Sequence, residues 1–145
     1  MNYCISIDPG SYKCGLVLAD INKKVVLDGR VVRAPSVVNL IYEWQSQYPI
    51  QLFLLGNGTN SKYWFSEINS LEIARINYVE EYGTTLRARR RYWELCPPNP
   101  FLFFIPQGIL LTPKNLDSLA ALILLEDHFK KKFHWLGDID FRTWP

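Results

Sequence analysis

The chain has 145 residues, which is enough for one domain and too few for two. Hydrophobic residues make up 48% of the sequence and charged residues 21%, as in an ordinary globular protein. The net charge is only +2, so the chain as a whole is not strongly basic. The longest apolar stretch, residues 116–125, contains Asp117 and is too short to cross a bilayer. Because no signal-peptide pattern follows Met1, we expect a cytoplasmic protein without a membrane partner.

Basic residues are distributed unevenly along the sequence. Arg87 and the arginines at 89–91 form one cluster, and the lysines at 130–132 form another. Such clusters suit a polyanionic partner, although a solvated helix face explains them equally well. The three cysteines show neither CxxC spacing nor a histidine partner pattern, which argues against a zinc site or a disulfide framework.

The first third of the chain predicts three strands joined by short loops. Residues 3–7 are apolar and β-favouring, and they end at the turn signal Asp8-Pro9-Gly10. Residues 13–19 and 24–33 continue the strand pattern, so the short connections imply an antiparallel meander. Asp28-Gly29 interrupts the third strand, either as a bulge or as a second turn.

The apolar spacing then changes to that of helices alternating with strands. Ser36 is the predicted N-cap of the first helix, and Thr84 or Thr85 that of the third. The tail after Phe133 is expected to be peripheral. In chain order, the predicted elements are a helix over 36–48, a strand over 51–55, a helix over 61–70, a strand over 73–79, a helix over 84–96, a proline-rich loop over 97–113 and a helix over 115–131.

This order of elements predicts an α/β fold. Helices between the later strands imply parallel crossovers, whereas the opening meander is antiparallel. We therefore expect a single domain spanning residues 1–145, with a mixed five-stranded sheet (three antiparallel strands, then parallel strands) and helices packed on it. Ligands of such open sheets bind beyond the carboxyl ends of the strands.

Three acidic residues fall where this architecture brings ligands together. Asp8 ends the first strand, Glu81 follows the strand over 73–79, and Asp117 lies in the first turn of the last helix. Carboxylate oxygens suit Mg²⁺ or Mn²⁺, and such ions activate water against a phosphodiester. Each acid alone has a plainer explanation, as a turn residue or as a charge favoured at a helix start. Their joint placement is what points to a shared site.

At these residues the chain resembles the YqgF/RuvX family of RuvC-like nucleases. Residues 7–17 (IDPGSYKCGLV) resemble the D-P-G-T/S…G-V-A hairpin of that family. Residues 79–85 (VEEYGTT) resemble its V-D-E-R-x-T-T segment, and residues 117–124 (DSLAALIL) resemble its closing D-x-x-A-A-x-x-I-L helix. The three matches occur in the family's order and span almost the whole chain.

The resemblance implies an RNase H-like fold and Mg²⁺- or Mn²⁺-dependent phosphodiester hydrolysis, with Asp8, Glu81 and Asp117 as catalytic metal ligands. Family members are associated with ribosomal RNA precursor processing and were earlier labelled Holliday-junction resolvases, so the implied partner is RNA or branched DNA. Three departures leave the substrate open. Tyr82 replaces the usual arginine, and residues 55–59 (LGNGT) replace the more common P-x-x-x-x-G loop. Lys114 stands where true RuvC resolvases carry a further aspartate.

Other residues are expected to contact the nucleic acid. The loop Gly56-Asn57-Gly58-Thr59 follows a strand, and it is either a phosphate-binding loop or a plain turn. On the helix over 84–96, Arg87, Arg90 and Arg91 share one face, which is expected to be exposed while Leu86 points inward. The residues assigned to nucleic-acid binding are Asn57, Thr84, Arg87, Arg90 and Arg91.

Three functional hypotheses follow from these residues. The first is a metal-dependent endonuclease, and the second is a non-catalytic nucleic-acid-binding module of the same fold. The three carboxylates argue against the second, because a pure binding protein gains nothing from buried like charges. The third is a relative of actin-type kinases, but their two-domain fold needs about twice this length or more. The sequence does not decide the oligomeric state.

Overall fold

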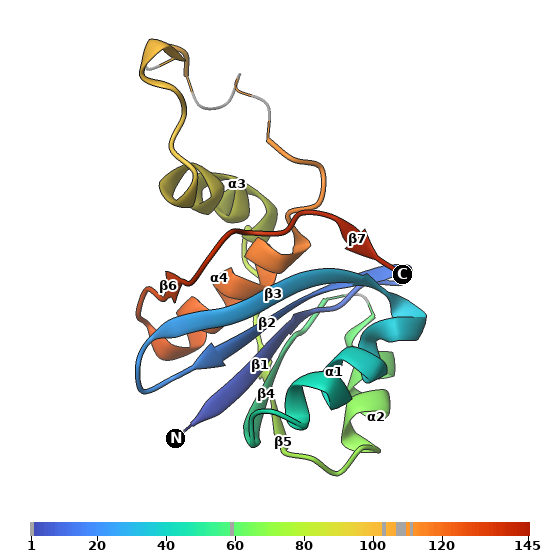
Figure 1. The fold of residues 1–145 in the computed structure, drawn as a ribbon. Helices are drawn as coiled ribbons and strands as arrows, with labels where there is room; N and C mark the ends of the chain where they lie inside the picture. Colours follow the sequence, from blue (N-terminus) through green and yellow to red (C-terminus); the bar gives the residue numbers. More distant parts are fainter. Residues whose placement is uncertain (1, 59, 103, 107–109, 111) are drawn as a thin grey trace.

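A mixed β-sheet forms the centre of the molecule (Figure 1). The computed structural model describes residues 2–58, 60–102, 104–106, 110 and 112–145. Within these ranges the strand order is β5-β4-β1-β2-β3-β6, and β7 also pairs with β3. The strands are β1 (Tyr3–Asp8), β2 (Lys13–Asp20), β3 (Val25–Arg33), β4 (Ile50–Gly56), β5 (Arg75–Val79), β6 (His134–Trp135) and β7 (Thr143–Trp144).

The strand directions confirm the predicted mixed sheet. β1, β2 and β3 form an antiparallel meander, and β4 and β5 extend the sheet in parallel beyond β1. On β2, Leu18 pairs with Asp28, but its neighbour Ala19 pairs with Val26, which leaves Leu27 as an extra residue on β3. The interruption seen in the sequence at residues 28–29 is therefore a bulge in a continuous strand and not a second turn.

Helices cover both faces of the sheet (Figure 1). α1 and α2 lie on one face, whereas α4 lies on the other and α3 packs on the outside of α4. A short 3-10 turn, η2, falls inside the predicted proline-rich loop. None of the helices described is long and apolar enough to cross a membrane. The helices are η1 (Ala34–Ser36), α1 (Val37–Gln45), α2 (Ser61–Asn69), α3 (Thr84–Leu95), η2 (Pro100–Leu102) and α4 (Asp117–Phe129).

Two helix starts differ from the predicted capping. Ser36 precedes α1 as expected, but its side chain makes no capping hydrogen bond. α3 is preceded by Gly83 in the left-handed conformation, with φ 57°, so neither Thr84 nor Thr85 is its N-cap. Glycine adopts this conformation without the steric cost that a Cβ atom imposes. Both threonines are therefore inside the first turn of α3.

α4 lies unusually close to the sheet because small residues line the contact. A Cβ atom added to Gly15 on β2 would lie 1.9 Å from the backbone oxygen of Asp117, the first residue of α4. One turn further along α4, the buried Ser6 hydroxyl of β1 donates a hydrogen bond of 2.7 Å to the Ala121 carbonyl. Gly15 and Ser6 thereby fix the height and the position of the N-terminal half of α4 over β1 and β2.

The C-terminal tail adds two short strands to the five that were predicted and contributes Trp135 to the core, which corrects the prediction that all of the tail after Phe133 is peripheral. β6 and β7 both run parallel to β3 along its free edge. Phe133 and Trp135 are buried and pack in the same apolar cluster as α4. Asn115, just before α4, donates hydrogen bonds to the Phe141 carbonyl and the Thr143 hydroxyl. Within the meander, β2 pairs with both β1 and β3, and β4 pairs with the other edge of β1. The outer edge of β3 is therefore the one left for the tail.

Gly15→Ala tests the close approach of α4. The added methyl group would overlap backbone atoms at the start of the helix, which cannot rotate away as a side chain does. We expect the free energy of unfolding to fall by about 2 to 3 kcal/mol, as measured by urea denaturation. Ser11→Ala, at an exposed position in the same hairpin, is the control. Equal stability of the two variants would show that α4 is free to shift.

Candidate active site

Asp8, Glu81 and Asp117 line one cavity of about 450 Å³ at the edge of the sheet. Asp8 ends β1, and Glu81 lies two residues beyond β5. Because β1, β4 and β5 are parallel, their carboxyl ends lie together, and both Asp8 and Glu81 lie at these ends. Asp117 lies far from both in the sequence and is the first residue of α4. The close approach of α4 to β2 at Gly15 places Asp117 beside the other two acids. The structure thus brings together the three acids that the sequence singled out.

The loop after β4 forms a closely fitting cradle around the Glu81 carboxylate. A Cβ atom at Gly56 would lie 2.3 Å from Glu81 Oε1, and one at Gly58 would lie 2.5 Å from Glu81 Oε2. The Asn57 side-chain oxygen accepts a hydrogen bond of 2.9 Å from the Glu81 backbone N–H. The structure therefore shows this loop positioning Glu81. Contact between Asn57 and a substrate stays a prediction, and Thr59 lies outside the described residues.

The turn after Asp8 is held from the other face of the sheet. The buried Trp64 of α2 donates a hydrogen bond of 2.8 Å from its indole nitrogen to the Gly10 carbonyl. Asn60, just before α2, donates a second one of 3.1 Å to the same oxygen. Asp8 is therefore anchored through β1 on one side and through this doubly bonded turn on the other.

The electrostatics of the cavity favour a protonated Asp8. Burial, followed by the charges of Glu81 and Asp117, raises the pKa of Asp8 to about 8. Burial also raises the pKa of Glu81, although a hydrogen bond with Asp8 and the backbone N–H of Gly58 oppose the shift. At neutral pH this pKa favours a protonated Asp8 that is hydrogen-bonded to Glu81.

Asp117 interacts with a lysine from the neighbouring hairpin. Lys13 Nζ lies 3.2 Å from Asp117 Oδ2 and also donates a hydrogen bond to the Asn115 side chain. This contact is an ion pair and not a hydrogen bond, since Asp117 Oδ2 is buried without a hydrogen-bond partner among the described atoms. Lys13 is therefore a partial counterion for the third acid.

The oxygen atoms in the cavity are of the kind that binds a divalent cation. Glu81 Oε1 and Asp117 Oδ2 are both buried and lack hydrogen-bond partners within the described part of the chain, which is costly unless another group satisfies them. Oxygen donors of this type match Mg²⁺ or Mn²⁺ rather than zinc. The described residues contain no closed cluster of three His, Cys, Asp or Glu ligands, so the carboxylates would have to draw together around an ion.

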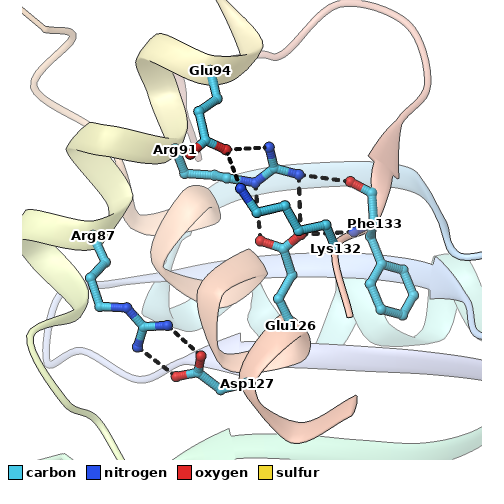
Figure 2. A network of polar contacts seen from close by, with 7 residues as sticks. All are labelled: Arg87, Arg91, Glu94, Glu126, Asp127, Lys132 and Phe133. Carbon is cyan, nitrogen blue, oxygen red and sulfur yellow. Dashed lines mark hydrogen bonds and ion pairs between the residues drawn. The ribbon is translucent and has the colours of Figure 1, made fainter. Parts of the chain in front are cut away.

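The arginines of α3 do not share one exposed face, which corrects the prediction from their spacing (Figure 2). Arg91 is buried and pairs with Glu126 of α4, with an Nε–Oε1 distance of 3.0 Å. Arg87 forms two hydrogen bonds to Asp127, also on α4. Only Arg90 of the three is exposed, whereas Leu86, expected to point inward, is 57% exposed. α3 is rotated from the predicted phase because its arginines bind the acids of α4.

Two basic residues of the cavity were not assigned to the site from the sequence. Arg89 of α3 and Lys114, which precedes α4, both line the cavity, together with the predicted residue Thr84 and its neighbour Thr85. The sequence contained a partial signal for Arg89, because it follows Thr85 by four residues and so lies on the same side of a helix. Lys114 was noted only as a departure from RuvC resolvases.

Comparisons with known proteins do not identify a family. No protein-family model matches the chain, and no curated protein matches its sequence. Among solved structures, the chain is similar to the catalytic core domain of BIV integrase, with 15% identity, a TM-score of 0.41 and coverage of 92% of this chain and 88% of that one. A likeness this distant adds nothing about activity. The strand order and the helices on both faces confirm the predicted α/β fold, with antiparallel and parallel strands in one mixed sheet.

Asp8 should make the stability of the metal-free protein depend on pH. Its pKa is about 8 in the folded protein and near 3.8 in the unfolded chain. As pH rises between these values, the unfolded chain loses this proton while the folded protein keeps it, so stability falls. In EDTA we expect Asp8→Asn to be more stable than the natural protein by about 1 to 3 kcal/mol at about pH 9, and by less at about pH 5.

Thermal or urea unfolding across this pH range measures the difference. Glu80→Gln, at an exposed position beside Glu81, is the control variant. If Asp8→Asn keeps the same dependence of stability on pH as the natural protein, the Asp8 carboxyl does not hold a proton in the folded state.

Arg91 should act in stability and not as an exposed contact. Its guanidinium bonds to Glu126, to Glu94 and to the Phe133 carbonyl. Arg91→Met leaves the buried Glu126 charge without its cation, and we expect a loss of about 3 to 5 kcal/mol in urea unfolding. Arg90→Met, at the exposed neighbouring position, should change stability by less than about 0.5 kcal/mol. Similar losses in both variants would contradict the buried ion pair.

Proposed function

We propose that this chain is a divalent-metal-dependent endonuclease that hydrolyses phosphodiester bonds in structured nucleic acid. The observation that carries the proposal is the convergence of Asp8, Glu81 and Asp117, from β1, the end of β5 and α4, on one cavity. Glu81 Oε1 is buried with neither a hydrogen-bond nor an ion-pair partner in the described residues, as expected of an atom that binds a cation, and Asp117 Oδ2 has only the Lys13 ion pair. The resemblance to the YqgF/RuvX family at these same three residues supports the assignment.

In this proposal Asp8, Glu81 and Asp117 hold Mg²⁺ or Mn²⁺ and are the catalytic residues of a single nuclease domain. The bound ion supplies an activated water and stabilises the leaving oxygen of the phosphodiester. The chain's own contribution is to hold the carboxylates in place. Gly56, Asn57 and Gly58 fix Glu81, while the Gly10 carbonyl is anchored by Trp64 and Asn60.

Cation binding requires a change of protonation within the site. Asp8 must lose its proton, because a carboxyl group binds a hard divalent cation as the anion. A bound cation would then balance the negative charge that this proton neutralises in its absence. Lys13 already faces Asp117, so it balances part of the negative charge throughout. Metal affinity should therefore increase as pH rises toward about 8.

The substrate in this proposal is RNA or branched DNA, as in ribosomal RNA precursor processing or junction resolution. The cavity is open on the surface and bears exposed or half-buried basic residues on its wall. A non-catalytic nucleic-acid-binding module is the alternative, and it would bind the same polymers without a requirement for the three acids.

Asp8→Asn should abolish cleavage while leaving binding nearly intact. Loss of one anionic ligand weakens the metal site without changing the basic surface, so we expect Mn²⁺-dependent cleavage of labelled single-stranded RNA, duplex DNA or a four-way junction to fall by about 100-fold or more. Glu81→Gln should behave in the same way, and Glu80→Gln, at the exposed neighbouring position, should cleave normally.

A second measurement does not depend on cleavage. Mn²⁺ should raise the melting temperature of the natural protein but not that of Asp8→Asn, because an ion stabilises the folded state only where it binds to it. Nucleic-acid binding with no cleavage by the natural protein on any of the three substrates would favour the non-catalytic module.

A further inference from the structure

Arg89 and Lys114 are two basic residues of the cavity whose position the fold does not explain. Neither side chain forms a hydrogen bond or an ion pair with any residue that the structure describes. By contrast, Arg87 and Arg91 on the same helix are each paired with an acid of α4. Stability of the α3–α4 packing therefore accounts for those two arginines, but not for Arg89.

The two cations are not counterions of the carboxylates either. Neither forms an ion pair with Asp8, Glu81 or Asp117 in the described part of the chain, whereas Lys13 does so with Asp117. Arg89 and Lys114 thus line the cavity together with the three acids without pairing with any of them.

Two cations that no acid of the cavity neutralises are available to bind an anion there. The cavity volume of about 450 Å³ is ample for a phosphate group with its flanking sugars. Arginine presents a planar set of donors that matches two phosphate oxygens, and lysine adds a mobile point charge. Thr84, Thr85 and Thr112 line the same cavity and add hydroxyl groups that can donate to phosphate oxygens.

We propose that Arg89 and Lys114 form a binding site for a backbone phosphate of the nucleic acid, placed beside the carboxylates Asp8, Glu81 and Asp117. The inference rests on the proposed nuclease function and deepens it, because it names the group that positions the substrate. Arg89 and Lys114 are positioning residues: they hold a phosphate and do not bind the metal. Binding through the backbone carries no base preference, so the site accepts RNA and DNA alike.

The test is the salt dependence of binding by charge-neutralised variants. Arg89→Gln, Lys114→Gln and the double variant are titrated with fluorescently labelled single-stranded RNA in calcium buffer at several salt concentrations. Each lost phosphate contact should lower the slope of log affinity against log salt by about 0.7 on a single strand. We expect the double variant to bind about 10-fold more weakly at low salt and to show a slope that is less steep by about 0.7, because both residues bind the same phosphate.

Matched variants separate this site from general attraction to a basic protein. Arg75→Gln, at the start of β5 and thus at the opposite end of that strand from Glu81, replaces an exposed arginine. Lys62→Gln, on α2 at the other face of the sheet, replaces an exposed lysine. Both should keep the natural slope. Arg89→Lys should restore part of the slope but not the full affinity, because it keeps the charge and loses the planar pair of donors.

The outcomes distinguish this inference from the proposed function. An unchanged slope in the double variant, or an equal loss in Arg75→Gln and Lys62→Gln, overturns the phosphate site even if Asp8-dependent cleavage is found. Weaker binding with the reduced slope supports the phosphate site even if the natural protein cleaves nothing, in which case the nuclease function alone fails. Urea unfolding of each variant verifies that a loss of binding is not a loss of folding.

Discussion

The close contact between α4 and β2 at Gly15 is the constraint on which the rest of this structure depends. No side chain larger than hydrogen fits between the strand and the backbone of Asp117. The helix can therefore sit directly on the β1–β2 hairpin, where Ser6 binds the Ala121 carbonyl. This contact places an acid from the end of the chain beside one from its beginning. Without it, Asp117 would lie away from the cavity and the site would lose one of its three carboxylates.

Electrostatic repulsion is the cost of assembling that site. Burial and two neighbouring acids raise the pKa of Asp8 to about 8, so the resting cavity is partly protonated. Glu81 cannot move away from Asp8, because Gly56 and Gly58 enclose its carboxylate and Asn57 binds its backbone. A site that holds like charges together lowers the stability of the folded protein, and such sites are typical of ligand binding or catalysis. This is the physical reason to regard the cavity as functional and not as a gap in the packing.

The basic residues of α3 divide into two groups with different tasks. Arg87 forms an ion pair with Asp127, and Arg91 forms one with Glu126 (Figure 2). Arg91 also donates a hydrogen bond to the Phe133 carbonyl, and Glu126 accepts one from the Phe133 backbone N–H. These ion pairs join α3, α4 and the C-terminal tail into one layer. Once α3 is fixed in this orientation, Arg89 is directed to the cavity and Arg90 to solvent. One arginine run therefore supplies two residues that stabilise the packing of α3 on α4, one that lines the cavity and one that faces solvent.

The sequence by itself determined the order of strands and helices through β5 and α4, and it identified Asp8, Glu81 and Asp117. It could do so because period, turn signals and strand ends are local properties of the chain. Tertiary structure alone decided the rotation of α3, since Arg91 is buried by Glu126, 35 residues away along the chain. It also decided the place of the tail, because the edge of β3 that binds β6 and β7 exists only after the meander has formed. The roles of Arg89 and Asn57 likewise follow from neighbours that are brought together only by folding, at the cavity and at Glu81.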